Sequence, residues 1–373
     1  MLTVAIAGGS LGGLCAGIAL RGIGCDVDIF EQTAGALTSR GAGIVVQGEV
    51  VSLLRAHHAP PLPITSCSHR RYLDADTGGV RDVPMAQQFT SWESLYTTMK
   101  AVFPATRYHT GCAMSAWEDT PDAVSAEVVG YGTVRAEVLV CADGSRSASR
   151  RRLLPAVSAR YAGYVAWRGT LDEAQAPDRL ARFFDDCFTF CEARSQGHAL
   201  CYFIPGEGAT VARGTRRLNW VWYVTVPEGA DLDRLLTDRD GRRRDTSVTP
   251  GAMPLDRVRE LSETAARELH PRFADLIQAT PDPFLQAIVD VRVPRMAFGR
   301  ACLLGDAAFV VRPHTAAATA KAAVDATALA DALRRDPGDV PAALRSWERS
   351  QLPYGQDLTN YGVSLGGRSV RGQ

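Results

Sequence analysis

The stretch "AIAGGSLGGLCAGIAL", residues 5–20, decides the fold of this chain. The apolar run before its glycines predicts a short buried strand, and the residues after them predict a helix. Gly8, Ser10 and Gly13 match the pattern G-x-G-x-x-G, with serine at the middle glycine. Small residues here let the backbone approach a pyrophosphate, and the free N–H groups of the new helix point at its negative charge. The Ser10 hydroxyl can still donate to a phosphate.

The segment after that helix ends in an acidic residue. "CDVDIFE" predicts a second strand, and its last residue is Glu31. An acidic residue about 20 positions beyond the glycines suits a ribose hydroxyl. Strand, glycines, helix, strand and acid fall in the expected order, although a glycine-rich turn of another α/β protein has similar features. The residues expected to bind a dinucleotide, FAD or NAD, are Gly8, Gly9, Ser10, Leu11, Gly13 and Glu31.

Composition and charge narrow the class of protein. A chain of 373 residues exceeds one ordinary core and predicts two domains. Hydrophobic residues make up 46% and charged residues 22%, which is typical of a soluble globular protein. The formal net charge of zero argues against a nucleic-acid or anionic-membrane partner. No window is long and apolar enough to span a bilayer.

The cysteines favour a reducing compartment. Nine of them are scattered through the chain, with neither a C-x-x-C pair nor a Cys/His cluster. We therefore expect no metal site and a cytoplasmic location. The missing cysteine pair also excludes a disulfide reductase.

The middle of the chain predicts a β-sheet inserted into an α/β nucleotide-binding fold. Residues 161–226 consist almost wholly of aromatic and β-branched runs separated by polar turns, which favours an antiparallel sheet. The turn in "RYLDADTGGVRDVPM" predicts a hairpin. Helices return after Pro254, and a cleft between the two parts is the expected ligand site. We predict a discontinuous Rossmann-type FAD-binding domain made of residues 1–65, 90–157 and 288–373. Residues 66–89 and 158–287 are predicted to form a mostly antiparallel substrate-binding domain.

Two further motifs separate FAD from NAD. Asp143-Gly144 follows one predicted buried strand, and Gly305-Asp306 follows another, ahead of an alanine-rich helix from about residue 315 to 333. A carboxylate at a strand end can accept hydrogen bonds from a polyol, and a helix N-terminus presents N–H groups to a carbonyl or an anion. A flavin needs both, because it has a ribitol chain and a C2 carbonyl that becomes negative on reduction. An NAD site needs no second acid so far along the chain.

The glycine-rich loop, the D-G motif and the G-D motif together resemble the single-component FAD-dependent aromatic hydroxylases, the para-hydroxybenzoate hydroxylase group. Similarity to the branch that hydroxylates dihydroxypyridines shows in "GAGIVVQ", "RYHT", "YAGYVAWRG" and "LLGDAA", which begin at residues 41, 107, 161 and 303. It extends over nearly the whole chain. The resemblance implies that NAD(P)H reduces FAD, that O2 adds to it, and that a flavin C4a-hydroperoxide hydroxylates an electron-rich aromatic or heteroaromatic small molecule.

The resemblance also assigns cofactor-binding residues. Glu31 would bind the adenosine ribose, and Asp306 would hold the ribitol. Asp143 and Gly144 would serve FAD and, transiently, NAD(P)H. The segment from Pro313 to Ala318 would lie against the isoalloxazine. The remaining residues implied to contact the cofactor are Arg40, Ala316 and Ala317.

Two positions depart from the family pattern. Trp92 stands where many relatives have an arginine, which removes one cationic contact to FAD. "PHTAAATA" replaces the usual P-x-x-G-Q-G, and Ala318 stands where relatives keep glycine. A methyl group there would crowd the flavin ring or move it towards an open position. We therefore expect a change in flavin geometry rather than a loss of flavin binding.

The substrate site is expected at the cleft face of the inserted sheet. Strand alternation puts Trp220 and Trp222 on one face and Tyr223 on the other, and we expect Tyr223 with Tyr202 to face the substrate. All of these aromatics could equally form the sheet core. His314 is the candidate base, because imidazole titrates near neutrality and an ionised hydroxyl makes the ring more electron-rich. The side-chain amide of Gln47, in the loop after Arg40, could hydrogen-bond a heterocyclic substrate.

Other functions are compatible with the same motifs. A flavin monooxygenase that performs an epoxidation, a Baeyer–Villiger oxidation or an oxidative decarboxylation on a natural-product intermediate would use nearly the same residues. A non-catalytic protein that binds FAD or an aromatic ligand is a second alternative, motivated by Trp92 and Ala318. A halogenase is disfavoured, since no W-x-W-x-I-P stretch is present. The expected partners are a small aromatic substrate and O2, and the resemblance leaves room for a homodimer.

Overall fold

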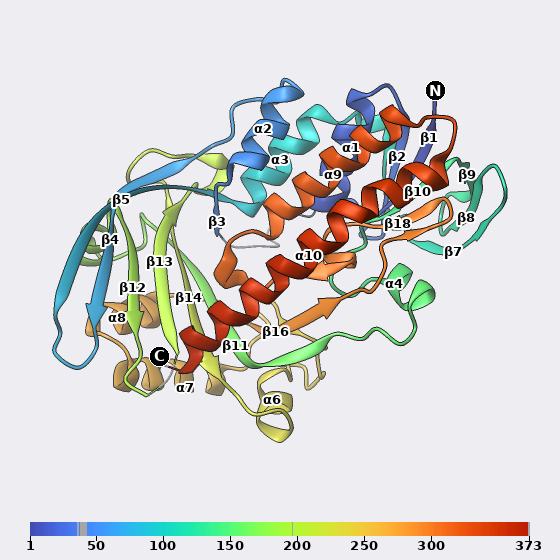
Figure 1. Ribbon diagram of the computed structural model, residues 1–373. Coiled ribbons are helices and arrows are strands. Elements are labelled where there is room, and N and C mark those ends of the chain that lie inside the picture. Colours follow the sequence, from blue (N-terminus) through green and yellow to red (C-terminus); the bar gives the residue numbers. More distant parts are fainter. Residues whose placement is uncertain (36, 38–42, 196, 372–373) are drawn as a thin grey trace.

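The computed structural model describes residues 1–35, 37, 43–195 and 197–371, and Figure 1 shows their arrangement. A helix-covered sheet built from both ends of the chain lies beside a second, larger sheet built mainly from its middle. The long helix α10 (Val340–Arg371) runs across both parts and ends near the larger sheet.

The first sheet carries the nucleotide-binding pattern. Its six strands follow the order β17-β18-β10-β1-β2-β6, and all neighbours pair in parallel except β17 with β18. The central strands β1 and β10 consist mainly of buried apolar residues, because helices cover the sheet. The strands are β1 (Thr3–Ala7), β2 (Asp26–Glu31), β6 (Tyr108–Thr110), β10 (Val138–Cys141), β17 (Ala297–Phe298) and β18 (Ala301–Leu303).

Register aligns the ends of three parallel strands of this sheet. Ala7 at the end of β1 pairs with Cys141 of β10, and Cys141 pairs with Leu303 of β18. The carboxyl ends of parallel strands open at the same edge, so the three loops that follow must meet there. These are the glycine-rich, D-G and G-D loops.

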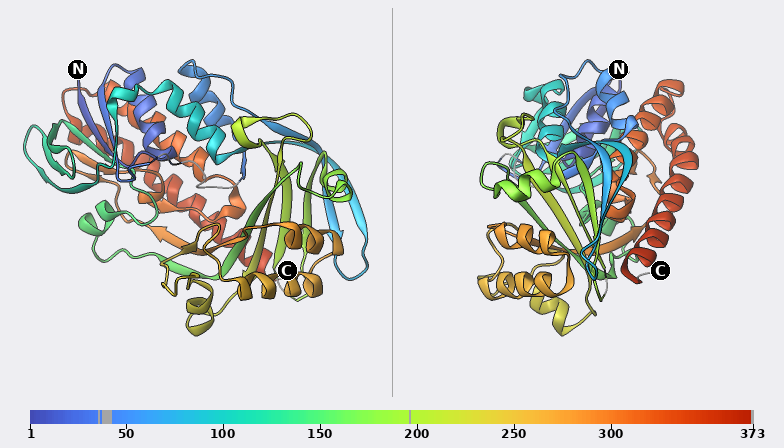
Figure 2. Two further views of the ribbon diagram at one scale, coloured as in Figure 1. Left: turned by 180° about the vertical axis from the view of Figure 1, so that it is seen from behind. Right: turned by 90° about the vertical axis from the view of Figure 1, so that its left-hand side faces the viewer.

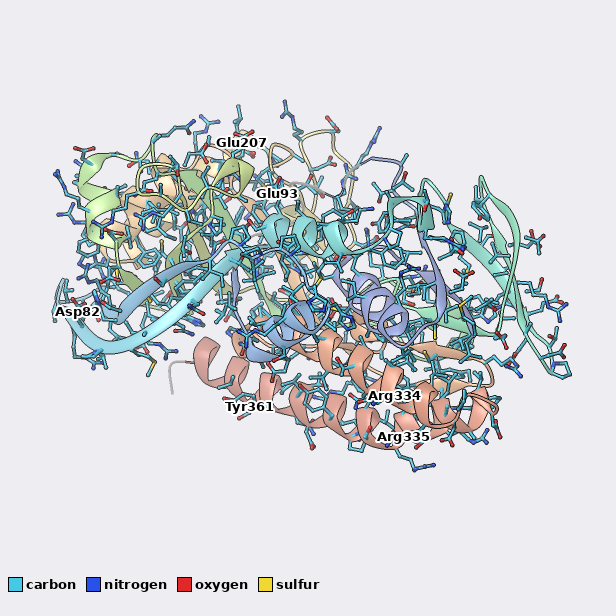
Figure 3. All side chains as sticks on the ribbon, turned by 90° about the horizontal axis from the view of Figure 1, so that it is seen from above. Asp82, Glu93, Glu207, Arg334, Arg335 and Tyr361 are labelled. Carbon is cyan, nitrogen blue, oxygen red and sulfur yellow. The ribbon has the colours of Figure 1, made fainter. Side chains whose placement is uncertain are left out.

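Helices α1 and α9 pack against one another on this sheet. α1 (Leu11–Gly22) follows the glycine-rich loop as predicted, and α9 (Ala318–Arg335) is the predicted alanine-rich helix. α9 lies between α1 and α10, and small alanine side chains allow this close packing. Arg334 and Arg335 end α9 at the surface, where Figure 3 labels them, and they suit the negative end of the helix dipole.

The second sheet has ten strands and is mostly antiparallel. Its order is β15-β16-β11-β14-β13-β12-β4-β5-β3, with β19 paired to β16; β12 and β4 pair in parallel. The predicted hairpin is β4 with β5. The strands are β3 (Gly43–Val45), β4 (Thr65–Asp74), β5 (Val80–Ser91), β11 (Arg160–Asp172), β12 (Cys187–Glu192), β13 (His198–Ile204), β14 (Arg217–Thr225), β15 (Ser247–Val248), β16 (Phe284–Arg292) and β19 (Phe309–Val310).

Helices cover one face of this larger sheet, and its other face points towards the nucleotide-binding part (Figure 2). Trp220 and Trp222 lie in the helix-covered core, whereas Val221 and Tyr223 lie on the opposite face, so the predicted alternation is confirmed. One helix, α5 (Asp178–Phe184), corrects the expectation of almost continuous strand over residues 161–226. Leu180 and Phe184 on α5 are fully buried against the sheet, so packing rather than strand propensity decides this segment.

The remaining elements are short or peripheral. β7, β8 and β9 form a separate three-stranded sheet. β3 pairs with β5 in the larger sheet, although residues 1–65 were assigned to the FAD-binding domain; the two-domain division stays a prediction. The other elements are α2 (Gly48–Ala56), α3 (Trp92–Val102), α4 (Ala148–Leu153), α6 (Ala230–Leu235), α7 (Leu255–Glu268), α8 (Pro271–Ala279), β7 (Met114–Asp119), β8 (Val124–Val128) and β9 (Gly132–Ala136).

Two general properties concern membranes and cysteines. Over residues 1–35, 37, 43–195 and 197–371, no helix has both the length and the apolarity needed to cross a membrane. Each of the nine cysteines is free and buried.

Candidate active site

The glycine-rich loop has the shape of a phosphate cradle. Gly8 has φ of +102°, a conformation that a residue with a side chain rarely adopts. A Cβ on Gly9 would lie 2.3 Å from the hydroxyl oxygen of Tyr108, and one on Gly13 would lie 1.8 Å from the carbonyl oxygen of Gly8. Ser10 precedes α1 and makes no side-chain capping hydrogen bond, so its hydroxyl is free of that role. The backbone here fits a pyrophosphate.

Glu31 lies beside this cradle. Its carboxylate accepts hydrogen bonds from the backbone N–H of Gly9 at 2.9 Å and of Thr33 at 2.8 Å, and the residue is 5% exposed. These bonds hold the carboxylate at the end of β2, and each oxygen keeps a further lone pair for a ribose hydroxyl. The position therefore fits the predicted role, which stays a prediction.

The D-G loop is organised by its own side chains. The Ser147 hydroxyl donates to Oδ1 of Asp143 at 2.5 Å, and the backbone N–H of Ser149 donates to Oδ2 at 2.9 Å. Arg150, 3% exposed, donates through Nη2 to the carbonyl of Ser145 at 2.6 Å and through Nη1 to that of Ala307 at 2.9 Å. Arg150 therefore ties the D-G loop to the G-D loop. The cofactor contacts assigned to Asp143 and Gly144 stay predictions.

Asp306 in the G-D loop has an unused carboxylate. No group among the described residues hydrogen-bonds this side chain. Burial raises the pKa of Asp306 to about 6, while Lys321 and Arg150 act in the opposite direction. A half-buried carboxyl without a partner needs hydroxyl donors. The ribitol of FAD supplies such donors, so this site fits the flavin.

A buried ion pair lies beneath the G-D loop. Nζ of Lys321 is 2.5 Å from Oδ2 of Asp325, and both residues are 0% exposed. The same Oδ2 accepts the backbone N–H of Gly305 at 3.0 Å, so the pair holds the turn that presents Asp306. This pair was not predicted from the sequence. Its signal was present, because Lys321 is one of only two lysines and stands four residues before an aspartate in an alanine-rich helix.

One cavity of about 1450 Å³ joins the flavin segment to the larger sheet. Of the residues predicted to bind flavin or substrate, it brings together the following set: Gln47, Tyr202, Tyr223, Pro313, His314, Ala316, Ala317 and Ala318. Arg40 lies outside the described residues. The amide Nε2 of Gln47 donates to the carbonyl of Ala316 at 3.2 Å, which anchors Gln47 to the flavin segment.

His314 is enclosed by aromatic rings. Its Nε2 is 3.0 Å from the hydroxyl oxygen of Tyr164, and its ring centroid is 4.3 Å from that of Tyr223. Burial lowers the pKa of His314 to about 3, with His198 and Arg312 adding to the effect. The premise that this imidazole titrates near neutrality is therefore corrected: the ring is neutral at physiological pH. Its base role stays a prediction, now for a neutral hydrogen-bonding imidazole.

Two tyrosines of the cavity, Tyr202 and Tyr223, and Tyr164 beside His314 stay protonated. Burial raises the pKa of Tyr164, Tyr202 and Tyr223. Tyr202 and Tyr223 can therefore each donate a hydrogen bond to a ligand oxygen in the cavity. Tyr164 was not singled out from the sequence, although strand alternation places it on the same face of β11 as Arg168, which lines the cavity.

In the flavin segment, the residue whose backbone conformation favours glycine is Ala316, two residues before the predicted Ala318. Ala316 has φ of +52°, in the left-handed region that favours glycine, whereas Ala318 begins helix α9. Ala316 also occupies the first glycine position of P-x-x-G-Q-G. The second departure, Trp92, stacks on Tyr96 with ring centroids 5.0 Å apart. How both departures affect the flavin stays a prediction.

Comparison with known proteins defines the class. Residues 161–290 match a family model described as FAD binding domain-like. A relative 36% identical covers 99% of this chain and 92% of its own length. The 6-hydroxynicotinate 3-monooxygenase of Bordetella bronchiseptica is 26% identical and covers 87% of this chain and 81% of its own. The chain belongs to the FAD-dependent aromatic and heteroaromatic monooxygenases, so it is an enzyme with FAD as its cofactor.

The first of these relatives is the 2,6-dihydroxypyridine 3-monooxygenase of Paenarthrobacter nicotinovorans. The solved structure of 2,6-dihydroxypyridine-3-hydroxylase from Arthrobacter nicotinovorans matches with a TM-score of 0.92 at 35% identity, over 100% of this chain and 93% of that one. The expected fold class, an α/β nucleotide-binding part with an inserted, mostly antiparallel sheet, is confirmed by this match.

Proposed function

We propose that this enzyme hydroxylates an electron-rich heteroaromatic small molecule of the hydroxypyridine class, with NAD(P)H as reductant and O2 as oxygen donor. One observation carries the proposal. The flavin segment Pro313–Ala318 and the tyrosine-bearing sheet face line a single cavity, so a ring on that face would meet the flavin edge. The 36% identity to a dihydroxypyridine monooxygenase supports this substrate class.

The residues of the cavity would bind and orient the ring. When bound, FAD supplies the redox and oxygen chemistry, and the protein must position the substrate and keep water away. Tyr202 and Tyr223 would donate hydrogen bonds to ring oxygens. Neutral His314 and Gln47 would contact the substrate beside the flavin segment. Glu31 and Asp306 would accept hydrogen bonds from the ribose and ribitol hydroxyls of FAD.

We extend the proposal to the surroundings of the enzyme. NAD(P)H would bind transiently, since the family typically uses it as the co-substrate. Nine buried, free cysteines support a cytoplasmic location. Homodimer formation and the absence of a nucleic-acid partner stay predictions.

The proposal is tested with a panel of 2,6-dihydroxypyridine, 6-hydroxynicotinate and phenol. We expect a yellow purified protein and substrate-stimulated NAD(P)H oxidation with one atom from ¹⁸O2 in the product. A product that has lost CO2 or gained a ring oxygen would instead identify another oxidation. A protein that stays colourless in excess FAD would refute the proposal.

A matched pair of variants locates the substrate. Tyr223→Phe removes a hydroxyl on the cavity wall, whereas Tyr161→Phe removes one that donates to the Val226 carbonyl at 3.0 Å outside the cavity. We expect Tyr223→Phe to raise KM about five- to tenfold, the cost of one hydrogen bond. Tyr161→Phe should leave KM unchanged. If Tyr223→Phe and Tyr161→Phe had equal KM values, the substrate would not bind at Tyr223.

A further inference from the structure

The imidazole of His314 uses one of its two ring nitrogens inside the protein. Nε2 lies 3.0 Å from the hydroxyl oxygen of Tyr164 on β11. The other nitrogen, Nδ1, hydrogen-bonds no group in the described part of the chain. Because His314 lines the cavity, Nδ1 is the ring nitrogen that a ligand there can reach. Whether Nδ1 offers that ligand a proton or a lone pair depends on which nitrogen carries the hydrogen of the neutral ring.

Tyr164 is held on its other side by a paired arginine. Nε and Nη2 of Arg312 donate to the carboxylate of Asp290 at 2.8 and 2.6 Å, so two parallel bonds fix the guanidinium. Burial raises the pKa of Tyr164, although the charge of Arg312 and a hydrogen bond between these two side chains act in the opposite direction. Tyr164 therefore keeps its proton beside a cation.

Helix α10 encloses this contact between Tyr164 and Arg312. A Cβ on Gly366 of α10 would lie 2.9 Å from Nη1 of Arg312 and 3.0 Å from the hydroxyl oxygen of Tyr164. Asp290 occupies the other two guanidinium nitrogens, so Nη1 remains for the phenol. Tyr164 is 2% exposed, and its hydroxyl is therefore shielded from bulk water.

The available donors fix the direction of the hydrogen bonds along this chain. A guanidinium has only donors, so the oxygen of Tyr164 accepts from Arg312. The hydroxyl of Tyr164 then donates its own proton, and Nε2 of His314 is the acceptor. In the opposite arrangement Nε2–H would donate to the phenol oxygen, and the phenol proton would have no acceptor among the described residues. An unpaired polar group is costly in a buried site.

We propose that Tyr164 and Arg312 are positioning residues that hold neutral His314 with its proton on Nδ1, so that the imidazole donates a hydrogen bond to an acceptor atom of the substrate. His314 then takes no proton from the substrate, in contrast to the base expected from the sequence. This inference rests on the proposed function, because it specifies how that site contacts its heteroaromatic substrate. A donor here suits a hydroxypyridine, whose oxygens accept hydrogen bonds.

The tautomer is measured by nitrogen NMR at pH 7 on the enzyme loaded with oxidised FAD and labelled with ¹⁵N-histidine. Protonated and unprotonated ring nitrogens give well-separated signals. The spectrum of His314→Gln identifies the signals of His314 among those of the seven histidines. In the wild-type enzyme we expect the Nδ1–H form to exceed the Nε2–H form about tenfold or more, the effect of one hydrogen bond.

Variants show which residues set the tautomer. Tyr164→Phe removes the donor to Nε2, so the Nε2–H form should become detectable. Tyr161→Phe is the matched control, because the hydroxyl of Tyr161 on the same strand donates to the Val226 carbonyl at 3.0 Å. Arg312→Met combined with Asp290→Asn is a second route: the phenol oxygen is then free to accept from Nε2–H, and no carboxylate is left unpaired. FAD content and the melting temperature confirm that each variant is folded.

Two substitutions of His314 test what the donor does for the substrate. His314→Gln keeps an N–H donor and has no basic nitrogen, whereas His314→Leu has neither. For the most active member of the substrate panel, we expect KM to rise about five- to tenfold in His314→Leu and about twofold or less in His314→Gln. An equal loss of kcat in both variants would indicate a base and overturn the inference.

The outcomes separate the inference from the proposed function. A wild-type Nδ1–H form that persists in Tyr161→Phe and gives way to Nε2–H in Tyr164→Phe or in the double variant supports the inference. An Nε2–H form in the wild type, or an unchanged tautomer in every folded variant of Tyr164 and Arg312, overturns it. The tautomer is measured without turnover. An Nδ1–H form without any hydroxylated product would therefore refute the proposed function and leave the inference in place.

Discussion

Replacing His314 by glutamine should reduce the fall in the free energy of unfolding that the protein shows at acidic pH. Burial lowers the pKa of His314 from 6.5 to about 3. A histidine with a lowered pKa binds its proton more weakly when folded, so acid favours the unfolded chain. Stability is therefore lost as the pH falls below 6.5, and the loss continues down to about pH 3. Glutamine does not titrate and lacks this effect.

The magnitude follows from the two pKa values. Between pH 7 and pH 5 the free energy of unfolding should fall by about 2 kcal/mol through His314 alone. With an unfolding entropy of about 2.1 cal/mol/K per residue over 373 residues, this lowers the melting temperature by about 2 to 3 °C. Other groups titrate in the same range, so the difference between wild type and His314→Gln isolates the contribution.

The assay is differential scanning calorimetry at pH 7 and pH 5 with a fixed excess of FAD. His58→Gln is the control, because His58 is exposed at the end of α2. We expect the wild type and His58→Gln to lose the same number of degrees and His314→Gln to lose about 2 to 3 °C less. Parallel losses in all three proteins would show that His314 is not held neutral by burial.

Two further substitutions test the cofactor cradle and its support. Gly9→Ala should weaken FAD binding at least tenfold by fluorescence titration, because its methyl group would displace the Tyr108 hydroxyl, whereas Gly48→Ala, with nothing within 4 Å, should not; equal affinities would contradict the cradle. Lys321→Met should lower the free energy of unfolding by about 3 to 5 kcal/mol in denaturant titrations, since it leaves the Asp325 carboxylate buried without its cation. Adding Asp325→Asn should recover part of that loss, and a double variant no more stable than the single one would argue against the ion pair.

Local features of the chain made much of the fold predictable. The nucleotide-binding motif is recognised from the hydrophobic periodicity of its elements and from the sequence spacing of its residues. Gly8 and Gly13, the helix after them and Glu31 could therefore be assigned without tertiary contacts. Alternation along β14 likewise separated Trp222 from Tyr223. The helix α5 was missed, because its burial against the sheet, rather than its propensity, decides it.

The sequence by itself determined the three cofactor loops and the class of enzyme, since these depend on short motifs and on the order of elements. Only the tertiary structure decided the electrostatics of the cavity. The neutrality of His314 depends on exclusion of water and on neighbours such as Tyr164 and His198, which lie more than 100 residues away in the chain. Solvation is a property of a packed interior, and no local pattern records it.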